Sequence, residues 1–169
     1  MKILLQSPTL LSRSSPFHKK KKNVLIQNGR IAEIGDKKYA ADKVINAKGM
    51  ILSIGWFDLG AYVGDPGHEQ KEDISSLAQT AAAGGFTGLA VLPNTHPCVQ
   101  TKNEVSYLMN GNSERLVQLY ALASVTRNNQ GEELTEMIDL HTAGAVGFTD
   151  GLKSVWHTDV FLKSLQYLQ

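Results

Sequence analysis

Residues 55–88 constrain the fold of this chain more than any other stretch. Trp56–Val63 is rich in apolar, β-prone residues and predicts a buried strand, and Gly64–Gly67 (GDPG) has the composition of a turn. A helix should follow, with acid in its first turn from Glu69, Glu72 and Asp73 and an apolar face from Ile74, Leu77, Ala78, Ala81 and Ala82. Gly84–Gly85 predicts a left-handed helix end, and Phe86–Leu92 predicts the next strand. A strand, a helix and a strand in this order predict a parallel, right-handed crossover.

The same alternation continues along the rest of the sequence. Thr101 and Glu104 have the spacing of a capping box, which predicts the start of another helix. The elements expected are helix Thr101–Asn110, strand Leu116–Ala123, helix Glu132–Leu140, strand Ala145–Phe148 and helix Thr158–Gln169. Residues 54–169 therefore hold about four β/α units, which predicts a parallel sheet. A closed barrel would need eight such units.

Residues 1–53 have a different pattern, with short strands and no helical periodicity. Val24–Ile26 and Arg30–Ile34 flank Asn28-Gly29, a pair that suits a two-residue type I′ turn, so a hairpin is predicted. Further short strands are predicted at Met1–Leu5, Val44–Asn46 and Met50–Ser53. We therefore expect two domains: a β-rich, meander-like segment over 1–53 and a β/α segment over 54–169.

Composition excludes several classes of partner and location. The 169 residues carry a formal net charge of +1, which gives no reason to expect a nucleic-acid partner. The basic run His18–Lys22 is expected to be a solvated loop or edge-strand guard, with a polyanion patch as the alternative. No apolar run approaches the ~20 residues of a membrane span. The single cysteine, Cys98, and the lack of a convincing signal peptide predict a cytoplasmic protein.

Several motifs together resemble the opening of dihydroorotases, which belong to the amidohydrolase superfamily. They are GWFDL, DPG, KEDI, AAAGGFTG and PNT, and the resemblance extends over nearly the whole chain. It implies a metal-dependent hydrolase of pyrimidine biosynthesis, built on a (β/α)8 TIM barrel flanked by a small β-sandwich. We therefore expect an α/β fold, a partial TIM barrel of about four β/α units preceded by a small β-rich sandwich segment. Because Gln169 follows no helix-stop signal, we expect a truncated, N-terminal part of a longer protein.

The positions that carry the chemistry of that family are altered here. The resembled enzymes place a His-x-His pair after the aspartate of the first barrel strand, and alternate residues of a strand point to the same metal ion. In this sequence Asp58 remains, but the pair is replaced by Gly60 and Tyr62, neither of which is a zinc ligand in this role. The family arginine that clamps the substrate carboxylate corresponds to Gly64. The resemblance therefore predicts no catalytic residue in this chain and no cofactor of its own.

Two other family positions keep a functional side chain. Asn94, in PNT, matches the asparagine that helps to bind the substrate carboxylate; the alternative is a turn residue that bonds its own backbone. Asp150, in GFTDG, matches the first aspartate of a motif that bridges metals in some members, but the second aspartate is Gly151 here. Asp150 is therefore a residual metal position, with a turn or N-cap role as the alternative. Asn94 is the candidate substrate-binding residue.

The remaining possible ligands have no established metal spacing. They are Asp65, His68, His96, His141 and His157. We expect His96 to approach Asp65 and His68 at the carboxyl ends of the strands, and His141 to lie at the end of its helix, where positive charge suits the helix dipole. Cys98 is expected to be structural. No dedicated metal site is predicted.

Three functions remain open from the sequence. The first is an inactive family member, a pseudoenzyme, that serves as a structural partner of aspartate transcarbamoylase, a role implied by the resemblance alone. The second is an active cyclic amidohydrolase that opens dihydroorotate with zinc held at a non-standard site. The third is a non-enzymatic small-molecule binder with its pocket at the strand ends. If the chain ends at Gln169, we expect a homo-oligomer, because a four-stranded sheet leaves two open edges that self-association would cover.

Overall fold

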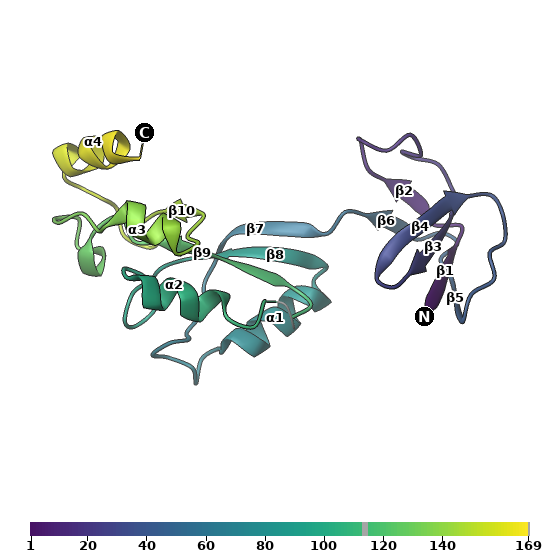
Figure 1. Ribbon diagram of the computed structural model, residues 1–169, viewed down its shortest axis with the longest axis horizontal. Helices are drawn as coiled ribbons and strands as arrows, with labels where there is room; N and C mark the ends of the chain where they lie inside the picture. Colours follow the sequence, from purple (N-terminus) through teal and green to yellow (C-terminus); the bar gives the residue numbers. More distant parts are fainter. Residues whose placement is uncertain (113–114, 169) are drawn as a thin grey trace. The chain divides into compact units, whose positions relative to one another are not determined.

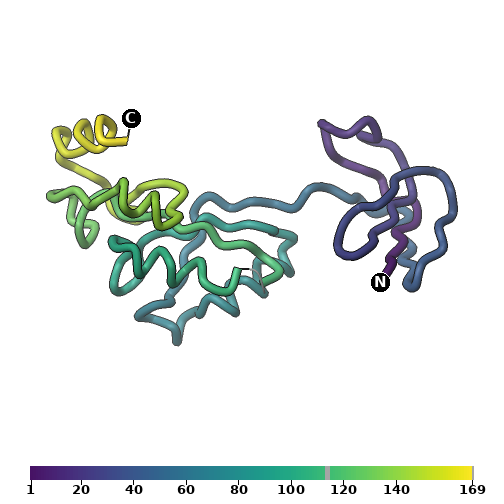
Figure 2. Tube along the Cα trace, viewed as in Figure 1, coloured from purple at the N-terminus to yellow at the C-terminus, as the bar shows by residue number. Residues whose placement is uncertain are grey.

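The computed structural model describes residues 1–112 and 115–168. The chain divides into two compact units, Met1–Ile54 (unit 1) and Gly55–Gln169 (unit 2) (Figure 1). The trace in Figure 2 follows unit 1 through short strands and unit 2 through alternating strands and helices. The change in pattern seen in the sequence near residue 53 therefore corresponds to a change in architecture.

Unit 1 consists of two small sheets. Its strands are β1 (Lys2–Gln6), β2 (Thr9–Leu11), β3 (Asn23–Gln27), β4 (Arg30–Gly35), β5 (Lys43–Asn46) and β6 (Ile51–Ser53). They form a four-stranded sheet in the order β4-β3-β1-β5 and a two-stranded sheet of β2 and β6. The predicted hairpin is confirmed: β3 and β4 are antiparallel, and Asn28 and Gly29 both have positive φ, as a type I′ turn requires.

The expected meander is wrong. β1 pairs in parallel with β5, and β2, which the sequence did not predict, pairs in parallel with β6. These pairings join strands that are distant in sequence and place β1 at the centre of its sheet, where Leu4 is only 2% exposed. The prediction rested on local turn signals, which do not report that Leu4 is buried at the centre of the sheet. This burial explains the difference between the expected meander and the observed strand order. In the basic run, His18 and Lys19 lie in a turn, and Lys22 pairs with Asp36 at 2.5 Å.

Unit 2 is built on a parallel sheet. Its strands are β7 (Trp56–Ala61), β8 (Phe86–Val91), β9 (Gln118–Ala123) and β10 (Gly147–Phe148), in the order β10-β9-β8-β7. All three pairings are parallel, as the alternation predicted. The helices are α1 (Ile74–Ala83), α2 (Lys102–Met109), α3 (Met137–Thr142) and α4 (Thr158–Tyr167). Figure 1 shows α1 and α2 running along the same side of the sheet.

The hydrophobic core lies between that side of the sheet and the helices. Alternate strand residues point into it, because the side-chain period of a strand is two. The core takes Leu89 and Val91 from β8, Leu119, Ala121 and Ala123 from β9, Ile74, Leu77, Ala78 and Ala81 from α1, and Val105 and Leu108 from α2. The apolar face predicted for α1 is therefore confirmed in its four main positions.

Helix ends follow local chemistry. The capping box of α2 is confirmed, with Thr101 and Glu104 each bonding the other's backbone. At α1 the acid expected in the first turn is absent, because the helix begins only at Ile74 and Asp73 is its N-cap, accepting from the Ser76 amide at 2.7 Å. Gly85 has the predicted positive φ after α1.

Two predicted elements differ from the structure because tertiary contacts decide them. The helix expected over Glu132–Leu140 begins only at Met137. The Thr135 hydroxyl donates to the Ser124 carbonyl oxygen at 2.7 Å, and this bond holds the residues before Met137 against the end of β9. The strand expected to be buried, β7, has an edge position and exposes Phe57 by 49% and Leu59 by 78%. The strand expected over Ala145–Phe148 is reduced to Gly147–Phe148.

The last helix, α4, is only partly packed. Val160 and Ser164 are buried, whereas Phe161, Leu162 and Leu165 are about half exposed. Gln169, the last residue of the predicted helix, lies outside the described residues. In the part of the chain that is described, no helix has the length and apolar character needed to cross a bilayer.

Candidate functional site

The carboxyl end of β7 is the position at which the resembled family holds its metal. Gly60 has no side chain, and a Cβ placed on it would meet no heavy atom within 4 Å. Tyr62 follows and is 38% exposed. The Asp58 carboxylate accepts a hydrogen bond from the Gly60 amide at 2.9 Å, so it is engaged by the backbone of its own strand end. This strand end has space but no histidine.

Gly64, which stands at the family arginine position, is enclosed by backbone. A Cβ there would collide with the His68 carbonyl oxygen and lie 3.0 Å from the Glu72 carbonyl oxygen. The Gly64 amide donates to Glu72 at 3.2 Å, and the His68 amide donates back to Gly64 at 2.6 Å. The loop after β7 is therefore folded onto Gly64, and a side chain at this position requires the loop to move.

Asn94 and Asp150 lie together, although 56 residues separate them in sequence. The Asn94 amide nitrogen donates to the Asp150 carbonyl oxygen at 3.1 Å, and the Asn94 oxygen accepts from the Leu152 amide at 3.0 Å. Both ends of the side-chain amide are thus bonded to the loop that follows β10. Asn94 joins the loops after β8 and β10 and does not bond its own backbone.

The Asp150 carboxylate is almost completely buried, with 2% of the residue exposed. One oxygen accepts from the Thr126 amide at 2.9 Å and the other from the Thr126 hydroxyl at 2.5 Å. The same hydroxyl oxygen accepts from the Gly131 amide at 2.8 Å. Both carboxylate oxygens are therefore committed to the loop after β9, and this arrangement holds two loops together.

Gly151 replaces the second aspartate of the family motif. Its φ is +61°, a backbone conformation that favours glycine. A Cβ on Gly151 would also collide with the side-chain oxygen of Asn94. An aspartate here would be strained and would displace Asn94 from its bonds with the loop after β10.

The loops after β7 and β8 meet, as expected for His96. The His96 amide donates to the Pro66 carbonyl oxygen at 2.9 Å, and a Cβ on Gly67 would lie 2.7 Å from the His96 Cβ. Across residues 1–112 and 115–168, however, no three His, Cys, Asp or Glu side chains are close enough together to hold a metal ion. Contact between the loops therefore does not assemble a ligand set.

The other candidates have separate surroundings. His141 lies in the last turn of α3, with Nδ1 3.3 Å from the Ala145 carbonyl oxygen, and His157 stacks on Trp156 with ring centroids 3.6 Å apart. Cys98 is buried, and burial raises the pKa of its thiol. Among the described residues, no hydrogen bond joins His141, His157 or Cys98 to Asp150.

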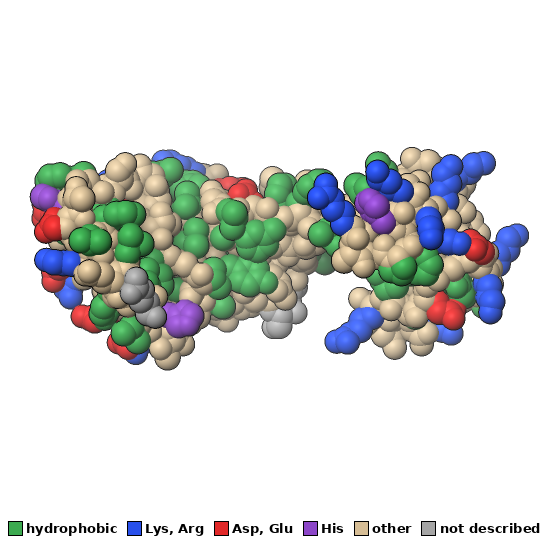
Figure 3. Space-filling view, turned by 90° about the horizontal axis from the view of Figure 1, so that it is seen from above, with side chains coloured by type: hydrophobic (Ala, Val, Ile, Leu, Met, Phe, Trp, Pro, Cys, Tyr) green, Lys and Arg blue, Asp and Glu red, His purple; other side chains and the backbone are tan. Residues whose placement is uncertain are grey.

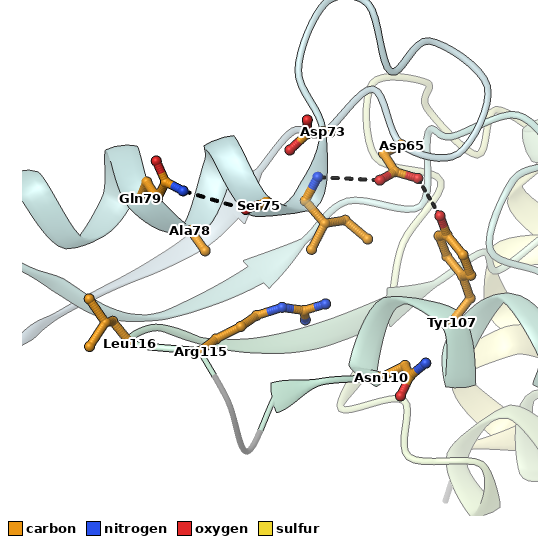
Figure 4. A pocket seen from close by; sticks show the side chains of 10 residues that line it. Asp65, Asp73, Ser75, Ala78, Gln79, Tyr107, Asn110, Arg115 and Leu116 are labelled. Atoms are coloured by element: carbon orange, nitrogen blue, oxygen red, sulfur yellow. Dashed lines mark hydrogen bonds between the residues drawn. The ribbon is translucent and has the colours of Figure 1, made fainter.

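A cavity of about 540 Å³ opens between α1 and α2. Its polar lining includes Asp65, Ser75, Gln79, Tyr107, Asn110 and Arg115, and Figure 4 shows the Arg115 guanidinium extending between the two helices. Asp65 is only 8% exposed; it accepts from the Tyr107 hydroxyl at 2.7 Å and from the Ile74 amide at 3.3 Å. That hydrogen bond to Asp65, followed by desolvation, raises the pKa of Tyr107. The cavity combines a cation with carboxylate and amide groups.

Sequence reasoning missed three of these residues: Tyr107, Arg115 and Thr126. Tyr107 and Arg115 lie at the end of α2 and just before β9, so the crossover brings them to the β7 loop. No local pattern singled out Tyr107, because its partner Asp65 lies 42 residues away in the sequence. Thr126 had no signal at all, because its role depends on a loop 24 residues away.

Comparison with known proteins gives a consistent family. The family model described as "Dihydro-orotase-like" matches residues 49–165. A dihydroorotase from Geobacter sp. (strain M21) is 38% identical over 148 residues, which are 86% of this chain and 35% of the relative. A dihydroorotase from Syntrophotalea carbinolica is 36% identical across 99% of this chain and 40% of its own length. The chain thus spans two fifths or less of the length of these curated relatives.

Solved structures agree with this on the fold. An L-hydantoinase (dihydropyrimidinase) from Arthrobacter aurescens superposes with a TM-score of 0.76 at 20% identity, covering 98% of this chain and 38% of that one. A dihydroorotase structure gives 0.62 at 17% identity, covering 99% of this chain and 48% of that one. The predicted fold class, a partial TIM barrel preceded by a β-rich segment, is confirmed.

Proposed function

Because this chain belongs to the dihydro-orotase-like family, we propose that it is a catalytically inactive member that serves pyrimidine biosynthesis as a scaffold. Metal-assisted ring opening needs a cation that lowers the pKa of a water molecule and polarises the carbonyl. The residues at the strand ends do not fit such an ion. Gly60 offers no donor, Tyr62 offers a phenol in place of an imidazole, and Asp150 directs both oxygens to Thr126.

The observation that carries the proposal is the crowding at two altered positions. Gly64 and Gly151 do not merely lack the family side chains; neighbouring atoms take the space that those side chains would need. At Gly64 the obstacle is backbone, which relaxes less readily than a side chain.

An assay of dihydroorotate hydrolysis tests the proposal. The chain is incubated with zinc and dihydroorotate, with the Geobacter dihydroorotase as a positive control. We expect no turnover above the uncatalysed rate. Zinc-dependent turnover would overturn the proposal and would establish the alternative, an active cyclic amidohydrolase with a non-standard site. Removal of that turnover by a chelator would separate it from a contaminating metal-independent activity.

A scaffold acts through a partner, and family membership favours aspartate transcarbamoylase. The test is size-exclusion chromatography of the chain with the transcarbamoylase of the same organism. Co-elution at a fixed stoichiometry is the expected result. Separate elution at micromolar concentrations of both proteins would exclude this partner, because a stable complex with an ordinary interface persists there.

A second candidate function, ligand binding without catalysis, is favoured by the cavity between α1 and α2. Its volume falls in the range of small-molecule sites, and Arg115 provides a cation for an anionic ligand. A thermal-shift assay with dihydroorotate tests it in wild type and in Arg115→Ala. Stabilisation of wild type alone would support binding in this cavity, whereas equal stabilisation of both would place the ligand elsewhere.

A further inference from the structure

The charge of the whole chain conceals a division between its two units. Unit 1 holds 11 of the 17 lysine and arginine residues but only three of the 16 aspartate and glutamate residues, so its formal charge is +8. Unit 2 holds six basic and 13 acidic residues, and its formal charge is −7. Figure 3 shows blue Lys and Arg side chains over much of unit 1, which lies on the right as in Figure 1. A charge asymmetry of this size between two parts of a chain points to a charged partner for one of them.

Two strand connections of unit 1 bring six lysines together. The connection from β2 to β3 contains Lys19–Lys22, and the connection from β4 to β5 contains Lys37 and Lys38. The Lys22 ammonium pairs with the Asp36 carboxylate at 2.5 Å, and the Asn23 side-chain amide donates to the Lys37 carbonyl oxygen at 2.9 Å. These bonds hold the two connections side by side. We call Lys19, Lys20, Lys21, Lys22, Lys37 and Lys38 the basic surface.

The basic surface displays its charges on a fixed backbone. The Lys19 amide donates to the Leu10 carbonyl oxygen at 2.7 Å, and the Leu10 amide donates to the Lys20 carbonyl oxygen at 2.9 Å, so the lysine run is held along β2. All of the six lysines except Lys22 are exposed. Among the described residues, the pair of Lys22 with Asp36 is the only salt bridge that the basic surface makes. The other lysines repel one another without a neutralising acid, and a bound polyanion would relieve that repulsion.

The residue types of the basic surface discriminate between classes of polyanion. Protein–protein interfaces are depleted in lysine and enriched in arginine and aromatic residues, whereas this surface is lysine alone. A membrane-binding surface adds apolar side chains that insert into the bilayer, and a single-strand nucleic-acid site adds exposed rings on which bases stack. The phenyl and phenol rings of the two connections belong to Phe17 and Tyr39, and both are partly buried. A double helix, which presents phosphates and no unstacked bases, fits this composition best.

From these features we infer that the basic surface binds the phosphate backbone of double-helical nucleic acid without sequence preference. A lysine ammonium is a hydrated point charge, which suits phosphate oxygens and does not read base edges. A duplex carries one negative charge per about 1.7 Å of its axis, so lysines at neighbouring positions each find a phosphate. The net negative charge of unit 2 directs the contact to unit 1. The expectation of no nucleic-acid partner rested on the charge of the whole chain, in which the two units nearly cancel.

Fluorescence anisotropy of a labelled DNA duplex of about 20 base pairs, titrated with the full chain, tests this inference independently of any hydrolase or scaffold role. We expect a dissociation constant of about 10 µM or lower at about 50 mM salt, and a logarithm of the binding constant that falls linearly with the logarithm of salt concentration. Lys20→Ala combined with Lys21→Ala should raise the dissociation constant by about tenfold and reduce the steepness of the salt dependence by about two. Lys37→Ala combined with Lys38→Ala should have a similar effect, because both connections belong to one surface.

Lys71→Ala combined with Lys153→Ala is the matched control, because it removes the same charge from two exposed positions of unit 2. It should leave the dissociation constant and its salt dependence unchanged, and far-UV circular dichroism should be the same in all variants. Poly-L-glutamate, phosphatidylserine vesicles and a single strand of equal length serve as competing probes, and each should bind more weakly than the duplex. No binding of the duplex at about 100 µM chain, tighter binding of any competing probe, or equal effects of the control and either unit 1 variant would overturn the inference.

Discussion

The strand ends of unit 2 differ in what they have kept. After β7, the positions that the family resemblance predicts as metal and substrate ligands hold Gly60, Tyr62 and Gly64, and the loop is folded onto Gly64. After β8 and β10, Asn94 and Asp150, which the resemblance matches to family positions, make hydrogen bonds that join loops. The two regions therefore differ in what holds them: backbone closes around Gly64 after β7, whereas side-chain hydrogen bonds join the loops at Asn94 and Asp150.

The largest effect on stability is expected when a residue that joins two loops is removed. Asp150→Ala leaves the Thr126 amide and hydroxyl without their acceptor in a site that is 2% exposed, which should lower the free energy of unfolding by about 3 kcal/mol. Urea denaturation measures the change. Asp58→Ala is the control, since Asp58 is less buried and accepts from a single amide, and it should cost under about 1 kcal/mol. Equal losses in the two variants would contradict a structural role particular to Asp150.

Adding a side chain at the end of β7 tests the other half of the comparison, which is the crowding around Gly64. Gly64→Ala places a Cβ against the His68 carbonyl oxygen and should destabilise unit 2 by about 1–3 kcal/mol. Gly60→Ala, four residues earlier with no heavy atom within 4 Å, should change stability by about 0.5 kcal/mol or less. If Gly64→Ala were as well tolerated as Gly60→Ala, the argument from crowding would fail.

A smaller effect is expected at the cavity. Tyr107→Phe deletes the hydroxyl that donates to Asp65 and should cost about 1 kcal/mol, whereas Tyr62→Phe should be neutral, since no hydrogen bond of the described residues uses its hydroxyl. The pKa of Tyr107 is raised above 10.0 in the folded state, so its contribution is complete below pH 10.0 and is lost as the pH rises through the raised pKa. The stability difference between wild type and Tyr107→Phe should therefore shrink in alkali; a difference that grew would contradict this sign.

The smallest effect concerns reactivity and not stability. Burial raises the pKa of the Cys98 thiol, so less thiolate is present at pH 8 than in an exposed cysteine. Alkylation by iodoacetamide should be about tenfold slower in the folded chain than in 8 M urea, because the folded chain has less thiolate and gives the reagent less access to the sulfur. A folded-state rate equal to the unfolded one would show that the loop after β8 is open.

Local signals predicted the regular parts of the fold. The Asn28-Gly29 turn and the Thr101 capping box each depend on neighbouring residues, and both formed as expected. The helix expected from Glu132 was wrong because Thr135 bonds to the end of β9, a contact that no local pattern reports. The exposure of β7 was also missed, because a buried strand and an edge strand of a parallel sheet have the same apolar composition.

The site was predictable by position but not by contact. The family resemblance located Gly60, Tyr62 and Gly64, yet only the structure could report that Gly60 has space and Gly64 has none. Asn94 and Asp150 were found as separate residues, and their shared network required coordinates. Thr126 and Tyr107 became visible only through their hydrogen bonds to aspartates distant in sequence.

Elemental analysis of bound metal tests the central claim most directly. The chain is purified with zinc in every buffer, dialysed against metal-free buffer and measured for zinc per chain, beside a variant with Gly60→His and Tyr62→His. The account predicts far below one equivalent in wild type, because the strand ends offer no ligand set. Zinc at one or two equivalents in wild type, retained on dialysis and released by chelator, would contradict it.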